Sequence, residues 1–223
     1  MKKNNNTLLI FDCDGVLVDS EPLANRTFIQ CLQKEGFDVD EAYAYKHFHG
    51  ISTRDCIAHI ELTFKRRVSD NFVETLSLLT NEEIKNTLQP IPHIKEALAA
   101  LSYPKCVASG SEPEKIQLSL EVTRLKKYFS HVYSSLQVQR GKPFPDVFLH
   151  AAKEMDFTPD QCIVIEDSNP GVQAALSAGM KVLLYRPILE DKSDHLLEEV
   201  TAFADMAHLP ALIHKIIQNA HLQ

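Results

Sequence analysis

Short apolar runs alternate along this chain with longer segments in which apolar residues recur at helical spacing. Apolar runs of this length are typical of buried strands. We expect strands at residues 7–11, 106–108, 132–134, 162–165 and 181–185, and a last short strand and helix after residue 191. Because helical patterns separate most of these strands, the sequence predicts an α/β fold with helices on both faces of a parallel sheet.

Residues 20–88 interrupt this alternation, because they show helical patterns and no convincing strand. Pro22 suits a first helical turn, Gly36 supplies a stop, and the apolar stripe between them consists of Ala24, Phe28, Cys31 and Leu32. Further helices are expected over 53–64 and 71–88. A helical module that follows the first strand directly could act as a lid over a site at the strand ends.

Two domains are therefore expected, a core made of residues 1–18 and 90–223 and an inserted helical domain of residues 19–89. The two prolines within residues 89–92 favour a return hinge there. Ligands of such sheets bind beyond the carboxyl ends of the strands. The polar residues at those ends are therefore the candidates for chemistry.

An acidic pair follows the first strand, in the sequence Asp12-Cys13-Asp14-Gly15. If strand geometry persists past Phe11, both carboxylates project the same way, because residues i and i+2 of a strand share a face. Two like charges held together stay ionised at low cost only where a cation or a proton intervenes. The pair therefore predicts Mg²⁺ binding with nucleophilic and acid–base work by carboxylates, the alternative being a strand that merely ends in a turn.

Three further strand ends carry polar residues that suit a phosphate site. Ser109 and Gly110 precede a helix, where hydroxyl and N–H groups can cradle an anion or simply cap the helix. Lys142 is held extended by the proline after it and can place a point charge on a phosphate, although lysines are most often exposed and solvated. Glu166 and Asp167 form a second acidic pair that can collect Mg²⁺ together with the first.

Composition narrows the range of functions. The 223 residues are 44% hydrophobic and 24% charged, as in an ordinary globular protein. The net charge of -7 argues against nucleic-acid and anionic-membrane partners, and no apolar run approaches the roughly 18 residues of a spanning helix. The five scattered cysteines predict reduced thiols and a cytoplasmic location, with Cys13 as a packing residue because nearby carboxylates disfavour its thiolate.

The chain resembles the haloacid dehalogenase superfamily of phosphohydrolases in four motifs that occur in the family's order: Asp12-x-Asp14-Gly15, Ser109, Lys142 and Glu166-Asp167. The helical insert resembles the small α-helical cap of that family, and the resemblance covers essentially the whole chain. It implies an α/β fold with a Rossmann-like parallel sheet core and an inserted cap. The pair Pro92-His93 departs from the Pro-Gly that relatives often have at the return hinge.

The resemblance also implies a role for each motif residue. Asp12 would attack phosphorus to form an aspartyl-phosphate, and Asp14 would protonate the leaving alcohol and then activate water. Ser109 and Lys142, with Gly110, would bind the phosphoryl group. The ligands of Mg²⁺ would be the Asp12 carboxylate, the Asp14 backbone carbonyl, Asp167 and, in or near the coordination sphere, Glu166.

The implied activity is a Mg²⁺-dependent phosphomonoester hydrolase that acts on a small phosphorylated metabolite, such as a hexose phosphate or 6-phosphogluconate. Specificity would come from polar residues near or within the cap, namely Glu21, Asn25, His47, His49 and Arg54. Glu21 and Arg54 are the substrate-binding candidates among them, since Arg54 suits a second anionic group. We expect a monomer or a weak dimer.

Two other functions are open at this point. A β-phosphoglucomutase-like phosphotransferase would carry a histidine at the position that matches Ala24, and this chain lacks it. A non-catalytic protein that binds a phosphorylated metabolite predicts the loss of at least one catalytic residue. All of those residues are present, namely Asp12, Asp14, Ser109, Lys142 and Asp167. The missing histidine and the complete set of catalytic residues both favour the hydrolase.

Overall fold

The computed structural model describes residues 6–48, 52–187 and 200–220. Its contacts divide the chain into two compact units, a sheet unit formed by Met1–Asp19 with Gln89–Gln223 and a helical unit formed by Ser20–Leu88. Each unit has a buried apolar core of its own. Across the described ranges, no helix is both long enough and apolar enough to cross a membrane.

The sheet unit contains a six-stranded sheet in the order β3-β2-β1-β4-β5-β6, and every neighbouring pair of strands is parallel. The strands are β1 (Leu8–Phe11), β2 (Lys105–Ser109), β3 (His131–Ser134), β4 (Cys162–Glu166), β5 (Lys181–Tyr185) and β6 (Thr201–Phe203). The strands expected from the apolar runs are confirmed. Because neighbouring strands are parallel, their carboxyl ends meet at the same edge of the sheet.

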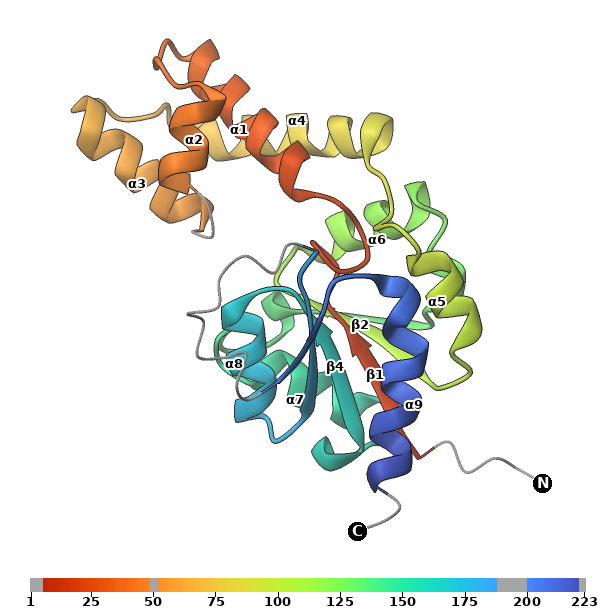
Figure 1. The fold of residues 1–223 in the computed structure, drawn as a ribbon. Coiled ribbons are helices and arrows are strands. Elements are labelled where there is room, and N and C mark those ends of the chain that lie inside the picture. Colours follow the sequence, from red (N-terminus) through yellow and green to blue (C-terminus); the bar gives the residue numbers. More distant parts are fainter. Residues whose placement is uncertain (1–5, 49–51, 188–199, 221–223) are drawn as a thin grey trace. The chain divides into compact units, whose positions relative to one another are not determined.

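Helices cover both faces of this sheet, which confirms the predicted α/β fold (Figure 1). The α-helices of the sheet unit are α5 (Ile94–Ala100), α6 (Pro113–Val122), α7 (Asp146–Glu154), α8 (Asn169–Ser177) and α9 (Leu209–Ala220). Short 3-10 helices lie at η1 (Lys126–Tyr128), η2 (Ser135–Gln137), η3 (Pro159–Gln161) and η5 (Met206–His208). Helices α7 and α8 lie on one face, and α5 and α9 lie on the other (Figure 1).

Alternate residues of the strands face opposite sides of the sheet, which explains why their sequence is apolar throughout. Leu8 and Ile10 belong to the core that α7 and α8 cover. Phe11 points to the opposite face and packs edge-on against Phe129, with the ring centroids 5.6 Å apart. Burial of each such side chain contributes about 1.5–3 kcal/mol to the free energy of unfolding.

The described residues of the helical unit form four helices, α1 (Glu21–Lys34), α2 (Glu41–Phe48), α3 (Thr53–Phe64) and α4 (Phe72–Thr87). Phe28 of α1 lies at the centre of its core, with ring centroids 5.3 Å from Phe48 and 5.7 Å from Phe72. Ser52 caps α3, because its hydroxyl accepts a hydrogen bond from the N–H of Asp55.

The apolar stripe predicted for α1 is wrong at one position, since Ala24 is exposed. Leu23 is buried instead, one residue earlier, together with Thr27. The larger side chain of Leu23 buries more apolar area than Ala24 would. Thr27 is satisfied there because its hydroxyl bonds the carbonyl of Leu23 at 3.1 Å and contacts the hydroxyl of Thr80 in α4.

The two connections that lead to the helical unit leave the sheet unit next to each other. Val18 and Pro90 form an isolated antiparallel bridge, and the N–H of Asp19 donates to the carbonyl of Gln89 at 3.0 Å. His93, at the position where Pro-Gly is the usual pair, has a φ of 63° in the left-handed region. Its imidazole Nδ1 lies 2.7 Å from Asp205 Oδ1, so the side chain is anchored within the sheet unit.

Candidate active site

The predicted site residues of the sheet unit lie at one edge of the sheet. Asp12 follows β1 and extends its pairing, because its N–H donates to the carbonyl of Ile165 at 3.0 Å. Ser109 is the last residue of β2, and Glu166 is the last residue of β4. Since β1 lies between β2 and β4, these three residues are neighbours by strand register alone.

Lys142 joins two of these strand ends. Its Nζ donates to Asp12 Oδ1 at 2.7 Å and to Glu166 Oε1 at 2.6 Å. The side chain of the lysine is 10% exposed, and its Nζ lies over the ring of Phe148, 4.9 Å from the ring centroid. Burial alone would lower the pKa of Lys142, but the charges of Asp12 and Glu166 outweigh it and raise that pKa, so the ammonium form is maintained.

Ionisation of the Asp12 carboxyl group is costly in this site. Burial raises its pKa to about 7, Lys142 opposes that rise, and the charge of Glu166 adds to it. A buried carboxylate whose ionisation is this costly is stabilised by any further cation placed beside it. The cluster therefore suits positive charge.

Glu166 is completely buried, and four donors satisfy its carboxylate. Oε1 accepts from Lys142, while Oε2 accepts from the N–H of Asp167 and from both the N–H and the hydroxyl of Ser168, at 2.8, 2.8 and 2.9 Å. Burial alone would raise the pKa of Glu166, but Lys142 and these hydrogen bonds hold it below its usual value. Glu166 therefore fixes the direction of the Lys142 ammonium.

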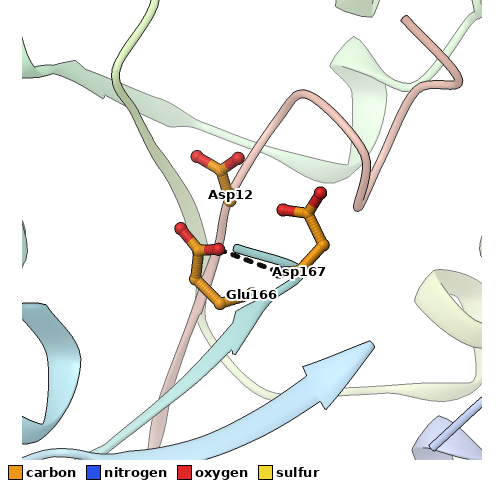
Figure 2. Close-up of side chains that lie close together, drawn as sticks. All are labelled: Asp12, Glu166 and Asp167. Atoms are coloured by element: carbon orange, nitrogen blue, oxygen red, sulfur yellow. Dashed lines mark hydrogen bonds between the residues drawn. The ribbon is translucent and has the colours of Figure 1, made fainter. Parts of the chain in front are cut away.

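A metal ion fits the carboxylates at this edge. Figure 2 shows Asp12, Glu166 and Asp167 close together, and one carboxylate oxygen of each lies within 4.8 Å of the others. A donor set made only of oxygens, with excess negative charge, is typical of Mg²⁺ or Ca²⁺ sites. The predicted acidic metal cluster is present among the described residues, except that the side chain of Asp14 is not part of it.

Strand geometry does not persist as far as Asp14, so the condition under which Asp12 and Asp14 would project the same way is not met. Strand β1 ends at Phe11, and the chain then turns, because the N–H groups of Leu17 and Val18 donate to the carbonyl of Cys13 at 2.9 and 3.1 Å. The carboxylate of Asp14 thus has partners of its own. They include Ser111 and Lys115, which the sequence reasoning did not single out.

Gly15 makes this turn possible. Its φ of 76° lies in the left-handed region, and a Cβ there would come 2.0 Å from Asp167 Oδ2. Its N–H donates to the carbonyl of Val18 at 2.9 Å, which closes the loop. The glycine therefore lets the loop after β1 approach the carboxylate that follows β4.

The predicted anion cradle after β2 has a buried serine at its base. Ser109 is buried, and its Oγ accepts from the N–H of Ser111 at 3.2 Å. Gly110 is exposed, and nothing lies within 4 Å of the place where its Cβ would be. Space for a ligand atom therefore exists beside the backbone at Gly110.

The remaining candidates belong to the helical unit. Glu21 in the first turn of α1 and Arg54 in α3 are both exposed. His49 lies outside the described residues. Within the helical unit, a cavity of about 310 Å³ is lined by Pro22, Asn25, Arg26, Ile29, Glu41, Ala44 and Tyr45. Asn25, one of the polar candidates, thus faces a cavity formed by α1 and α2.

Cys13 lies between the two aspartates and is buried. Burial raises its pKa well above the usual thiol value, and the charges of Asp14 and Asp12 raise it further. All five cysteines are free and buried. The predictions of free thiols and of a packing role for Cys13 are therefore confirmed.

Together, the fold and the site define an α/β enzyme with carboxylates and a lysine at the carboxyl edge of a parallel sheet. The profile of the haloacid dehalogenase-like hydrolases matches residues 9–185, and the chain belongs to this family. The predicted family membership is thereby confirmed.

Similar proteins include named phosphatases. The 6-phosphogluconate phosphatase of Escherichia coli K12 is 30% identical over 217 residues, which are 92% of this chain and 93% of the relative. The fructose-1-phosphate phosphatase YqaB of the same organism is 31% identical over 174 residues, which are 77% of this chain and 92% of the relative. These relatives confirm the predicted enzyme class, a phosphatase.

A solved structure supports the fold assignment over nearly the full length. The conserved haloacid dehalogenase-like protein ATU0790 of Agrobacterium tumefaciens, of unknown function, has a TM-score of 0.81 and 31% identity to this chain. The match covers 94% of this chain and 98% of that protein. The fold is therefore shared with that protein over nearly its full length.

Proposed function

We propose that this protein is a Mg²⁺-dependent phosphomonoester hydrolase that works through an aspartyl-phosphate at Asp12. The observation that carries the proposal is the contact of Lys142 Nζ with Asp12 and Glu166, at 2.7 and 2.6 Å. An ammonium held there reduces the repulsion between the Asp12 carboxylate and an anionic phosphate. The named phosphatases among the relatives support this reaction class.

The reaction has two steps on this arrangement. An oxygen of Asp12 forms a bond to phosphorus while the bond from phosphorus to the substrate oxygen breaks, and Asp14 gives its proton to that leaving oxygen. A water molecule then attacks the same phosphorus and loses a proton to Asp14. The bond between Asp12 and phosphorus breaks, which releases inorganic phosphate and restores both carboxyl groups.

The metal fits the residues already described. Asp12, Asp167 and the backbone carbonyl of Asp14 would hold it, with Glu166 in or near its coordination sphere. When bound, Mg²⁺ supplies positive charge that stabilises the phosphoryl oxygens in the transition state. Ser109, the backbone at Gly110 and Lys142 would bind the phosphoryl group.

We further propose a sugar phosphate as the substrate and no macromolecular partner. The relatives named for 6-phosphogluconate and fructose 1-phosphate support a small phosphorylated metabolite. The helical unit would act as the cap, with Glu21 binding substrate and Arg54 meeting a second anionic group. Free cysteines fit a cytoplasmic enzyme, and a monomer or weak dimer suffices for this function.

Phosphate release tests the function. We would measure it with Mg²⁺ and with EDTA on sugar phosphates, phosphoglycolate, 6-phosphogluconate and nucleotides. Release that requires Mg²⁺ and favours one substrate class is expected. Release that persists in EDTA contradicts the metal requirement, and no release from any compound by the folded protein favours the phosphotransferase or the non-catalytic alternative.

The nucleophile is tested by Asp12→Asn, which keeps the shape of the side chain and removes its nucleophilic oxygen. Turnover should fall by about 10³-fold or more, while the circular dichroism spectrum stays native. Asp160→Asn, an exposed acid in η3, is the matched control and should retain full activity. Hydrolysis at the wild-type rate in Asp12→Asn would exclude the assignment.

A further inference from the structure

Two side chains from the segment after β2 hold the carboxylate of Asp14. Ser111 Oγ donates to Asp14 Oδ2 at 2.6 Å, and Lys115 Nζ donates to Oδ1 and Oδ2 at 3.1 and 3.2 Å. Lys115 Nζ also donates to Ser111 Oγ at 3.1 Å. Both oxygens of the carboxylate are thus engaged, and the serine hydroxyl is polarised by the lysine that it accepts from.

The serine is fixed on its backbone side as well. The N–H of Ser111 donates to Ser109 Oγ at 3.2 Å, and its carbonyl accepts from Ser134 Oγ at 2.6 Å. Ser109 and Ser134 end β2 and β3 and are paired in the sheet. Lys115 comes from the first turn of α6. Through Ser111 and Lys115, Asp14 is therefore linked to the ends of two strands and to a helix.

Ser111 and Lys115 both donate to Asp14, so they complement a carboxylate that is acting as an acceptor. An ammonium has no acceptor atom, and the Ser111 hydroxyl already accepts from Lys115 and uses its single proton on Asp14. A charge-assisted network of this kind fixes the orientation of the carboxylate more firmly than neutral hydrogen bonds would. The ion pair is about three-quarters buried, with side-chain exposures of 27% and 28%.

We propose that Ser111 and Lys115 are positioning residues that orient the Asp14 carboxylate to take the proton of the water that attacks the aspartyl-phosphate. This inference rests on the proposed function and adds Ser111 and Lys115 to the residues that serve the reaction. In that step the water oxygen bonds to phosphorus, the Asp12–phosphorus bond breaks, and the proton of water passes to Asp14. Neither Ser111 nor Lys115 gains or loses a proton in this step.

The two steps can be separated with p-nitrophenyl phosphate, whose leaving group departs readily without a proton. For this substrate kcat/KM reports the first step, and kcat reports the second when the aspartyl-phosphate accumulates. Lys115→Met should lower kcat about 10- to 100-fold and leave kcat/KM within about threefold, so KM falls in parallel. A burst of p-nitrophenolate equal to the enzyme concentration should precede the steady state.

Two variants complete this experiment. Lys115→Arg should restore most of kcat, because the guanidinium can donate to the same oxygens. Lys126→Met removes an exposed lysine that pairs only with Glu121 among the described residues, and it should behave like wild type. An unchanged kcat in Lys115→Met, or an equal loss in kcat and in kcat/KM, overturns the positioning role.

A crystal structure of Lys115→Met tests, without an activity measurement, whether Lys115 holds the Asp14 carboxylate in place. The Asp14 carboxylate should leave its place, and a carboxylate that keeps the wild-type position overturns the inference. This result is independent of the proposed function, whose failure would show as a wild-type protein that releases no phosphate from any substrate. Ser111→Ala provides the second variant and should displace the same carboxylate.

Discussion

At the scale of single residues, the site joins two carboxylates whose environments differ sharply. Asp12 is buried beside Glu166, whereas Asp14 is partly exposed and tied to Lys115 and Ser111. Burial and a neighbouring like charge make ionisation costly for Asp12, whereas the carboxylate of Asp14 accepts hydrogen bonds from a hydroxyl and an ammonium. Such a division between two adjacent acids suits one residue that bonds to phosphorus and another that moves protons.

The cost of ionising Asp12 predicts a pH dependence of stability. Its pKa is about 7 in the folded protein against 3.8 as the reference value. Folded protein therefore binds the proton more tightly, so stability is lost as pH rises between these values, by on the order of 4 kcal/mol. Asp12→Asn lacks this loss. In EDTA, the unfolding free energy of Asp12→Asn minus that of wild type should therefore be larger at pH 8 than at pH 5.

Urea unfolding at both pH values measures this difference. Asp160→Asn serves as the control, because it changes the same residue type on an exposed turn. A difference between Asp12→Asn and wild type that does not vary with pH would refute the cost of ionisation. Addition of Mg²⁺ should reduce the difference, since a cation favours the ionised form of Asp12.

Sequence reasoning reached the residues that end strands, and Lys142 through the proline that follows it, but it missed Ser111 and Lys115. Asp12, Ser109, Glu166 and Asp167 follow apolar runs, so parallel strand order alone predicts that they meet. Lys115 carries no such signal. It is an ordinary lysine in the first turn of a helix, and its contact with Asp14 arises only when the loops after β1 and β2 are both folded.

At the scale of elements, α8 begins at Asn169, directly after the short turn that follows the end of β4 at Glu166. Ser168 caps the helix by accepting from the N–H of Gly171, while the same serine donates to Glu166 Oε2. A Cβ on Gly171 would lie 1.8 Å from Glu166 Oε1. The glycine therefore leaves room for the carboxylate that orients Lys142.

Gly171→Ala should disrupt this junction. The methyl group would displace the buried Glu166 from its four donors, and the free energy of unfolding should fall by about 2–4 kcal/mol. Gly110→Ala is the matched control, because nothing lies within 4 Å of its added Cβ, and its unfolding free energy should stay within about 0.5 kcal/mol of wild type. Equal stability of the two variants in urea would contradict the close approach.

Helices and strands can be predicted from the sequence where one pattern, such as a continuous apolar run, dominates a segment. The strands of the sheet are buried on both faces and so have continuous apolar sequences. Their predicted positions are confirmed to within one residue at each end. The buried face of α1 was predicted wrongly at Ala24, because Leu23 and Ala24 are both apolar and only packing decides which of them is buried. His93 shows a further limit, since a left-handed backbone in a residue other than glycine leaves no mark in the sequence.

At the scale of the whole molecule, the insertion is a unit with its own hydrophobic core. The buried residues around Phe28, Phe48 and Phe72 belong to the helical unit alone, and those around Ile10 and Phe148 belong to the sheet unit alone. The connections at Val18 and Pro90 are paired within the sheet unit. Two cores joined by two adjacent connections permit one unit to open while the other stays folded.

Phe28→Ala tests this independence. Removal of a buried phenyl ring that packs on two others should cost the helical unit about 3–5 kcal/mol, because the cavity cannot close fully. Native-state hydrogen exchange should then show faster exchange within Ser20–Leu88 and unchanged protection in β1, β2 and β4. Phe148→Ala, in the core under α7, should give the opposite pattern. If either variant lowered protection equally in both units, the two cores would unfold as one, which would contradict the independence of the helical unit.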